Sequence, residues 1–204
     1  MLSKLSLAAA LGAALITTSA ATAQVPAPYK LGSNTRALWL HAQMPAGCDP
    51  YVTASVNIWN GAGSRFRYSF SQSNSLTNDF DNLANSSRTT IQPGETSAIM
   101  TTRIRSSGRT LLDADVIVNE GRLFYGTNSS TRESGGQFHC SLSTVVPSNK
   151  MDFQTSVTHE LGHALGLDHT INRDCSMYSY QDYGEVRRTL CADEKAAIRG
   201  VYGS

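Results

Sequence analysis

Two histidines and a glutamate in the last third of the chain stand at spacings that suit a metal-dependent hydrolase. The segment HELGHALGLDH covers residues 159–169. On a helix, His159 and His163 differ by only about 40° around the axis and about 6 Å along it. Both imidazoles can therefore reach one zinc ion. Glu160 follows His159 directly, so it can lie beside the open position of the metal and act as a general base.

A third histidine, His169, follows His163 by six residues, which is too far for the same helix face. Gly166 lies between them and can take the positive φ that ends a helix. We expect the chain to turn back there, so that His169 supplies a third nitrogen ligand. Three protein ligands leave a fourth position for water, as in catalytic zinc sites. Chance produces such spacing in a chain of this size on the order of one time in a hundred thousand.

Helical spacing of apolar residues indicates the elements that would position this site. The first two histidines fall in a helix expected over residues 151–165, which Asp152 can start. An earlier helix is expected to have Asp49 as its N-cap and Pro50 at its first helical position. A last, short helix is expected over residues 193–202.

Strands are indicated at residues 36–41, 66–70, 98–105, 114–119 and 138–146. Residues 71–90 are rich in Ser, Asn, Thr and Asp, so we expect a surface excursion rather than a core element. Strands with a crossing helix, then a second helix and a small end with a third, indicate an α+β domain. We expect Ser134–Cys140 to offer an exposed sheet edge to which an extended peptide substrate adds.

The pattern HExxHxxGxxH followed by a methionine resembles the motif of the metzincin metallopeptidases. Met177 lies eight residues after His169, where that family has its methionine-bearing turn. Within the metzincins the chain is most similar to the matrixin branch. Thr170 stands where matrixins usually carry serine, and Ser179 replaces a common proline. The similarity rests on three segments: Asp152-Phe153-Gln154, Met177-Tyr178, and Asp193 to Tyr202-Gly203.

This resemblance implies a single catalytic domain with a twisted, mostly parallel sheet, two helices above the cleft, and a small lower subdomain that ends in a helix. It also implies an endopeptidase that cleaves proteins or peptides, with one catalytic zinc ion on His159, His163 and His169 and with Glu160 as the catalytic residue. The chain lacks the His- and Asp-rich stretch that holds structural zinc and calcium in many matrixins. Calcium is left open, with weak candidate ligands Asp113, Asp115 and Glu120.

Two other classes of function suit the same histidines. One is a secreted binding module that keeps zinc to stabilise its fold and has no turnover. The other is a zinc hydrolase that acts on non-peptide substrates.

Residues 1–23 have the pattern of a secretory signal peptide, with cleavage expected after Ala23. Its apolar run, Leu5 to Ile16, is shorter than the roughly 20 residues that span a membrane. We expect one catalytic domain over residues 24–204, with an upper part to residue 166 and a lower part beyond it.

Lys4 is the only charged residue of the signal segment, so the rest of the chain has a formal net charge of zero. Neither nucleic acid nor a membrane surface is indicated as a partner. Secretion into the extracellular space or the periplasm is expected.

Four cysteines in a secreted chain indicate two disulfides. We favour Cys175 with Cys191, which are close in sequence, and by elimination Cys48 with Cys140. The cysteine-switch motif of matrixins is missing. The alternative is that Cys48 stays free and caps the zinc with its thiolate, which would leave Cys140 without a partner.

Overall fold

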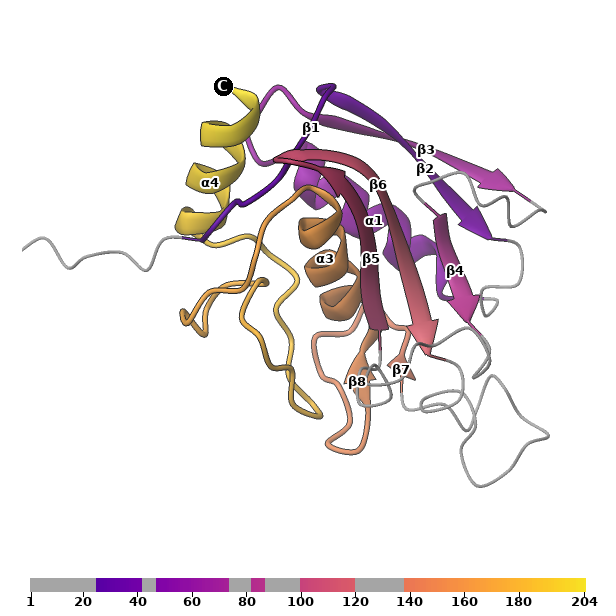
Figure 1. The fold of residues 1–204 in the computed structure, drawn as a ribbon. Helices are drawn as coiled ribbons and strands as arrows, with labels where there is room; N and C mark the ends of the chain where they lie inside the picture. The colour runs from indigo at the N-terminus through magenta and orange to yellow at the C-terminus, as the bar shows by residue number, and fades with distance from the viewer. Residues whose placement is uncertain (1–24, 42–46, 74–81, 87–99, 120–137) are drawn as a thin grey trace, which may run out of the picture.

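The computed structural model describes residues 25–41, 47–73, 82–86, 100–119 and 138–204. The expected signal peptide, Glu120 and residues 134–137 lie outside these ranges. Within them, the chain forms a mixed α+β fold with three helices, as predicted (Figure 1).

Within the described ranges, six strands form the main sheet, in the order β1-β6-β4-β2-β3, with β5 paired to β6. Among these six, the pairings of β1, β2, β3, β4 and β6 with one another are parallel, and β5 runs antiparallel to β6. Leu38 and Leu40 of β2 are buried, whereas Trp39 between them is 38% exposed, as alternation along a strand requires. The strands are β1 (Lys30–Leu31), β2 (Thr35–His41), β3 (Arg67–Ser73), β4 (Asn82–Ser86), β5 (Met100–Ser107) and β6 (Thr110–Asn119).

Strand β4 corrects the prediction that residues 71–90 contribute no core element. It pairs with β2 on one side and with β6 on the other, so it lies inside the sheet. The sequence of β4, NLANS, has no alternation of apolar and polar residues. The position of β4 in the sheet is set by backbone pairing with β2 and β6. The sequence pattern of β4 alone does not reveal this pairing.

Cys48 occupies the N-cap position of helix α1 (Asp49–Asn60) without a capping side-chain hydrogen bond, so the prediction that Asp49 is the N-cap is wrong by one residue. Pro50 is the second residue of the helix, one place after the first helical position predicted for it, and still lies in the first turn. Trp59 and Val56 face the core, and the Trp59 indole donates a hydrogen bond to the main-chain oxygen of Thr158 at 2.8 Å. Helix α1 therefore supports the helix that carries the histidines.

Helix α3 (Phe153–Ala164) begins after Asp152, whose carboxylate accepts a hydrogen bond from Thr155 N at 3.0 Å, as an N-cap does. The expected start at Met151 is wrong, because Met151–Asp152 form the short strand β8, paired with β7 (Phe138–His139). The expected strand 138–146 is likewise limited to two residues. Beyond it, the Ser141 and Ser143 hydroxyls accept hydrogen bonds from backbone N–H groups two residues ahead, which competes with strand pairing.

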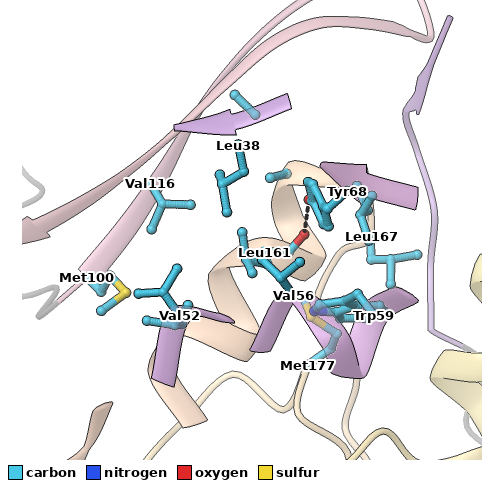
Figure 2. Close-up of a cluster of buried hydrophobic side chains, with 14 of the residues drawn as sticks. Leu38, Val52, Val56, Trp59, Tyr68, Met100, Val116, Leu161, Leu167 and Met177 are labelled. Carbon is cyan, nitrogen blue, oxygen red and sulfur yellow. Dashed lines mark hydrogen bonds between the residues drawn. The ribbon is translucent and has the colours of Figure 1, made fainter. Parts of the chain in front are cut away.

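The core lies between the sheet and the helices α1 and α3. Figure 2 shows Leu38 and Val116 of the sheet facing Val56 of α1 and Leu161 of α3. The Tyr68 hydroxyl donates to the main-chain oxygen of Leu161 at 3.0 Å. These contacts fix α3 against both the sheet and α1.

The last helix, α4 (Ala192–Tyr202), ties the end of the chain to its beginning. The Tyr202 hydroxyl accepts a hydrogen bond from Leu31 N at 3.0 Å and donates one to Leu165 O at 2.8 Å. Burial raises the pKa of Tyr202 to about 12, so this hydroxyl keeps its proton. None of the helices in the described residues is long and apolar enough to span a membrane.

Candidate metal centre

The side chains of His159, His163 and His169 converge on one point. Their Nε2 atoms lie 3.0 Å (His159–His163), 3.2 Å (His163–His169) and 3.3 Å (His159–His169) apart. Ligand nitrogens at 2.0–2.1 Å from a tetrahedral zinc lie roughly 3.3 Å from one another. The group could hold a metal ion, and its spacing suits zinc.

Main-chain oxygens orient two of the three rings. Nδ1 of His159 lies 2.7 Å from Ser176 O, and Nδ1 of His163 lies 2.9 Å from Leu167 O. A carbonyl oxygen only accepts, so each Nδ1 carries the proton and each Nε2 presents a lone pair. Burial and, to a smaller extent, the charge of His163 lower the pKa of His159 to about 3, so the ring is neutral at pH 7. Three lone pairs this close repel one another unless they share a cation.

The end of α3 brings His169 back to the site. Gly166 has a φ of +88°, as the sequence predicted, and its N–H donates to His163 O at 2.8 Å. Leu167 N donates to Gly162 O at 3.1 Å, which completes a Schellman turn. A Cβ at Gly166 would lie 2.3 Å from Tyr29 O, so glycine is also required sterically. The same turn places Leu167 O against the ring of His163.

Met177 is fully buried and packs against Gly162, the residue before His163 in α3. The main chain after His169 pairs with the methionine turn, because Thr170 N donates a hydrogen bond to Met177 O at 2.9 Å. A Cβ at Gly162 would lie 2.2 Å from Met177 Sδ and 2.8 Å from Trp59 Cζ2. The glycine inside the HELGH segment therefore makes room for the methionine.

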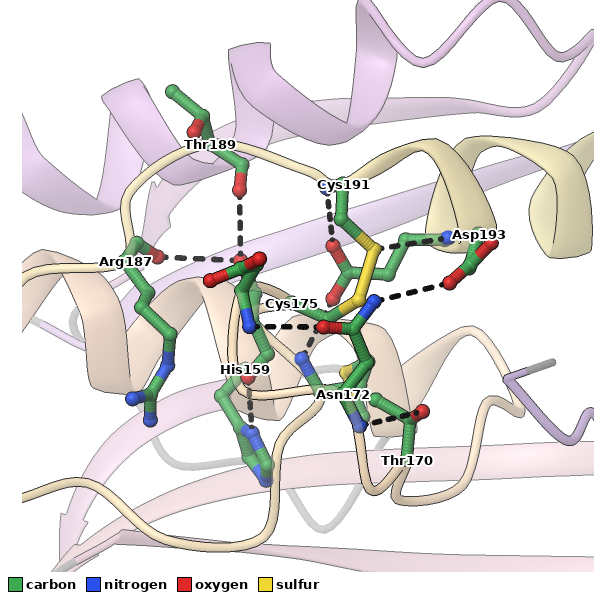
Figure 3. Close-up of a disulfide and its surroundings, with 12 residues drawn as sticks. His159, Thr170, Asn172, Cys175, Arg187, Thr189, Cys191 and Asp193 are labelled. Carbon is green, nitrogen blue, oxygen red and sulfur yellow. Dashed lines mark hydrogen bonds between the residues drawn. A yellow bond between two sulfur atoms is a disulfide. The ribbon is translucent and has the colours of Figure 1, made fainter. Parts of the chain in front are cut away.

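Glu194 holds this methionine turn from α4. Its carboxylate is fully buried and accepts hydrogen bonds from Met177 N at 2.6 Å and Cys191 N at 2.7 Å. The Cys175–Cys191 disulfide joins the same two segments, and Asn172 donates to Asp193 beside it at 3.1 Å (Figure 3). Ser176 lies next to Cys175, so this bracing also fixes the carbonyl that orients His159.

Glu160 presents its carboxylate to the same cavity as the three histidines, and the residue is 8% exposed. Burial raises its pKa, while the charge of His163 and hydrogen bonds from the side chain and the main chain of Thr102 oppose that rise. The Thr102 hydroxyl lies 2.7 Å from Glu160 Oε2 and 2.9 Å from Glu160 O. The carboxylate is thus anchored from the neighbouring strand.

The cavity has a volume of about 540 Å³ and runs between β5 and the segment after Met177. Residues of β5 line one side, and Tyr178, Ser179 and Tyr180 line the other. Arg187 also lines the cavity and is 8% exposed. It contacts the Tyr178 ring at 5.5 Å, donates to Tyr180 O and pairs with Glu185.

Other candidate residues lie elsewhere. His139 belongs to β7 and is not among the residues that line the cavity. Asp113 lies 3.9 Å from Arg36 and 3.8 Å from Arg105, so this carboxylate is opposed by arginines. These contacts do not test calcium binding, which the sequence left open. The segment Ser134–Cys140 is described only from Phe138, and the sheet edge that lines the cavity is β5 instead.

Both predicted disulfides are present. Cys48 bonds with Cys140, and Cys175 bonds with Cys191, so no described cysteine has a free thiol. The alternative in which Cys48 caps the metal is therefore wrong.

Residues 59–203 match the family model of the matrixins. The chain belongs to the matrixin family. A comparison with curated proteins found no similar sequence. Membership of the matrixins supports zinc binding and metalloendopeptidase activity on proteins or peptides. The match includes the three histidines, Glu160 and the methionine turn, and it begins after the N-terminal segment that contributes Pro28 and Tyr29 to the cavity.

Sequence reasoning missed three residues of this matrixin site. Gly162 could have been found from the sequence. A glycine inside a helix lowers the stability of the helix, so its presence indicates that a neighbouring side chain needs the space. Glu194 carried a weaker signal, since it stands three residues after Cys191 as in a capping box. Thr102 carried none, because its contact with Glu160 depends on the placement of β5.

Proposed function

We propose that this matrixin is a secreted zinc endopeptidase in which His159, His163 and His169 bind one zinc ion and Glu160 is the general base. The convergence of the three Nε2 atoms, with the Glu160 carboxylate on the same cavity, carries the proposal. The two oriented Nδ1–H groups support it, because they turn lone pairs toward the shared point.

Zinc, when bound, supplies a Lewis acid that makes a water molecule more acidic and polarises the scissile carbonyl. Glu160 takes the proton of the attacking water and then passes it to the leaving amine nitrogen, so it ends the cycle ionised. Burial suits this work, because it raises the pKa of the carboxyl above its ordinary value.

Strand β5 is the element that we propose to bind the substrate backbone. It pairs with β6 along one side, and Met100, Thr101, Thr102 and Ile104 line the cavity. An extended peptide can add to such a strand edge through main-chain hydrogen bonds. Ser179 and the buried Arg187 shape the opposite wall, so they would influence which side chain is accepted beside the scissile bond.

Secretion and the domain boundaries are further parts of the proposal. The signal-like pattern of residues 1–23 and the two disulfides support export to an oxidising compartment. Residues 24–204 would then form one catalytic domain, with its lower part beginning at residue 167.

A peptidase assay on a mixture of peptides tests this function. Cleavage should stop when a chelator removes the metal and should return when zinc is restored. Intact peptides in the presence of stoichiometric zinc would contradict the proposal. A zinc-stabilised binding module would then show ligand capture without turnover, whereas a non-peptide hydrolase would cleave ester or other non-peptide substrates.

A further inference from the structure

A threonine hydroxyl on the cavity-lining strand holds the carboxylate of Glu160. Thr102 lies on β5 and is separated from Glu160 by 58 residues of sequence. It shares a face of β5 with Met100, which is buried in the core, so the strand is fixed next to this position. Figure 1 shows β5 alongside α3.

The geometry distinguishes the two carboxylate oxygens of Glu160. An ionised carboxylate only accepts, so the Thr102 hydroxyl donates to Oε2 at 2.7 Å. Among the described residues, no other side chain hydrogen-bonds this carboxylate. Oε1 has no side-chain hydrogen bond among the described residues, and Glu160 lines the cavity. The main-chain N–H of Thr102 also favours the ionised carboxylate, and both substitutions at position 102 described below leave that group in place. The Thr102 hydroxyl also lies 2.9 Å from Glu160 O, so its single proton is shared between two acceptors of Glu160, and both contacts hold the hydroxyl against α3.

We propose that Thr102 is a positioning residue that holds Oε2 of Glu160 and thereby aims Oε1 at the attacking water. This inference rests on the proposed role of Glu160 as the general base. A glutamate side chain has three rotatable bonds, and misplacement of a reacting group by about 1 Å costs up to about a hundredfold in rate.

The proton balance is consistent with this role. The water proton arrives at Oε1 and leaves from Oε1 to the amine nitrogen. Oε2 therefore remains an acceptor before and after each transfer, and the hydrogen bond from Thr102 persists in both protonation states. The hydroxyl itself gains and loses no proton.

Two substitutions separate positioning from packing. Thr102→Val keeps the shape of the side chain and removes the hydroxyl, whereas Thr102→Ser keeps the hydroxyl and removes the methyl group. Both are assayed as full-length, zinc-loaded protein on a peptide that the parent cleaves. We expect Thr102→Val to lower kcat about 10- to 100-fold with KM within about twofold. Thr102→Ser should retain kcat within about threefold.

A double variant identifies the group through which Thr102 acts. In a Glu160→Gln background there is no base to aim, so adding Thr102→Val should change the residual rate by less than about twofold. Three results would each overturn the positioning role. The first is a parental kcat in Thr102→Val, and the second is an equal loss of kcat in Thr102→Val and Thr102→Ser. The third is the same fold-loss from Thr102→Val in the Glu160→Gln background as in the parent. If Glu160→Gln is inactive and Thr102→Val is normal, only this inference fails. If Glu160→Gln itself cleaves at the parental rate, the general base is wrong and the inference falls with it.

Discussion

At the scale of residues, the metal centre depends on main-chain oxygens as much as on histidines. Ser176 O and Leu167 O fix which nitrogen of His159 and His163 carries the proton. Neither oxygen belongs to the helix that carries these histidines. The turn after α3 supplies one, and the braced methionine turn supplies the other.

Removal of one ligand should abolish metal binding, whereas removal of an unrelated histidine should not. We expect His163→Ala to lose most bound zinc and all peptidase activity, because its Nε2 lies 3.0 and 3.2 Å from those of the other two histidines and its ring is oriented by Leu167 O. His139→Ala and His41→Ala are the matched controls and should keep both. Metal analysis of the purified variants measures this. Loss of zinc from either control would show that the ligand set is wrong.

Spacing predicted the convergence of the histidines because the helix period and one glycine decide it. Gly166 has the positive φ expected from its place between His163 and His169. The hydrogen bond between Thr102 and Glu160 could not be predicted from the sequence. Thr102 is far from Glu160 along the chain, and it belongs to an edge strand whose register is not set by any local pattern.

At the scale of elements, the start of α3 is joined to the cavity wall by a buried ion pair. Arg188 contacts both oxygens of Asp152, at 2.5 and 2.9 Å, and donates to Ser141 O and Leu142 O. Asp152 is fully buried and also caps the helix through Thr155. One arginine thus links the helix start, the segment after β7 and the wall that contains Arg187.

Arg188→Met should destabilise the protein by about 3 kcal/mol or more, because it leaves the Asp152 carboxylate buried without its cation. Lys195→Met is the control, since it removes a positive charge from an exposed position of α4 and should change stability by less than about 0.5 kcal/mol. Denaturant unfolding of both variants gives the comparison. Equal effects would contradict the role assigned to the ion pair.

Elements with strong local signals were predicted well, and those set by distant pairing were not. Helix α3 and its cap at Asp152 followed from helical spacing. Strand β4 has polar residues and takes its place from β2 and β6. The short β7 ends early because Ser141 and Ser143 hydrogen-bond the backbone locally.

At the scale of the whole molecule, two disulfides close loops of different length. Cys175 and Cys191 are 16 residues apart, whereas Cys48 and Cys140 are 92 apart. In the chain-entropy model, the short loop contributes about 3 kcal/mol and the long loop about 4 to 5 kcal/mol. We therefore expect Cys48→Ala with Cys140→Ala to lower the free energy of unfolding more than Cys175→Ala with Cys191→Ala. Thermal and denaturant unfolding of the two double variants measures these losses. A larger loss in the Cys175→Ala, Cys191→Ala variant would contradict the prediction.

The segment before the matrixin match also contributes to the site. Pro26 O accepts a hydrogen bond from Asp168 N at 2.8 Å, and Tyr29 packs against Gly166. Pro28 and Tyr29 line the cavity. The first described residues are therefore part of the wall around the histidines.

Peptide cleavage by zinc-loaded Glu160→Gln protein tests the central claim most directly. Glutamine keeps the size of the side chain but accepts no proton at working pH, so α3 and the three histidines should stay in place. We predict near-stoichiometric zinc, an almost unchanged Tm, and cleavage reduced at least about a hundredfold. If the variant holds its zinc and cleaves peptides at close to the parental rate, Glu160 is not the base and the mechanism is wrong.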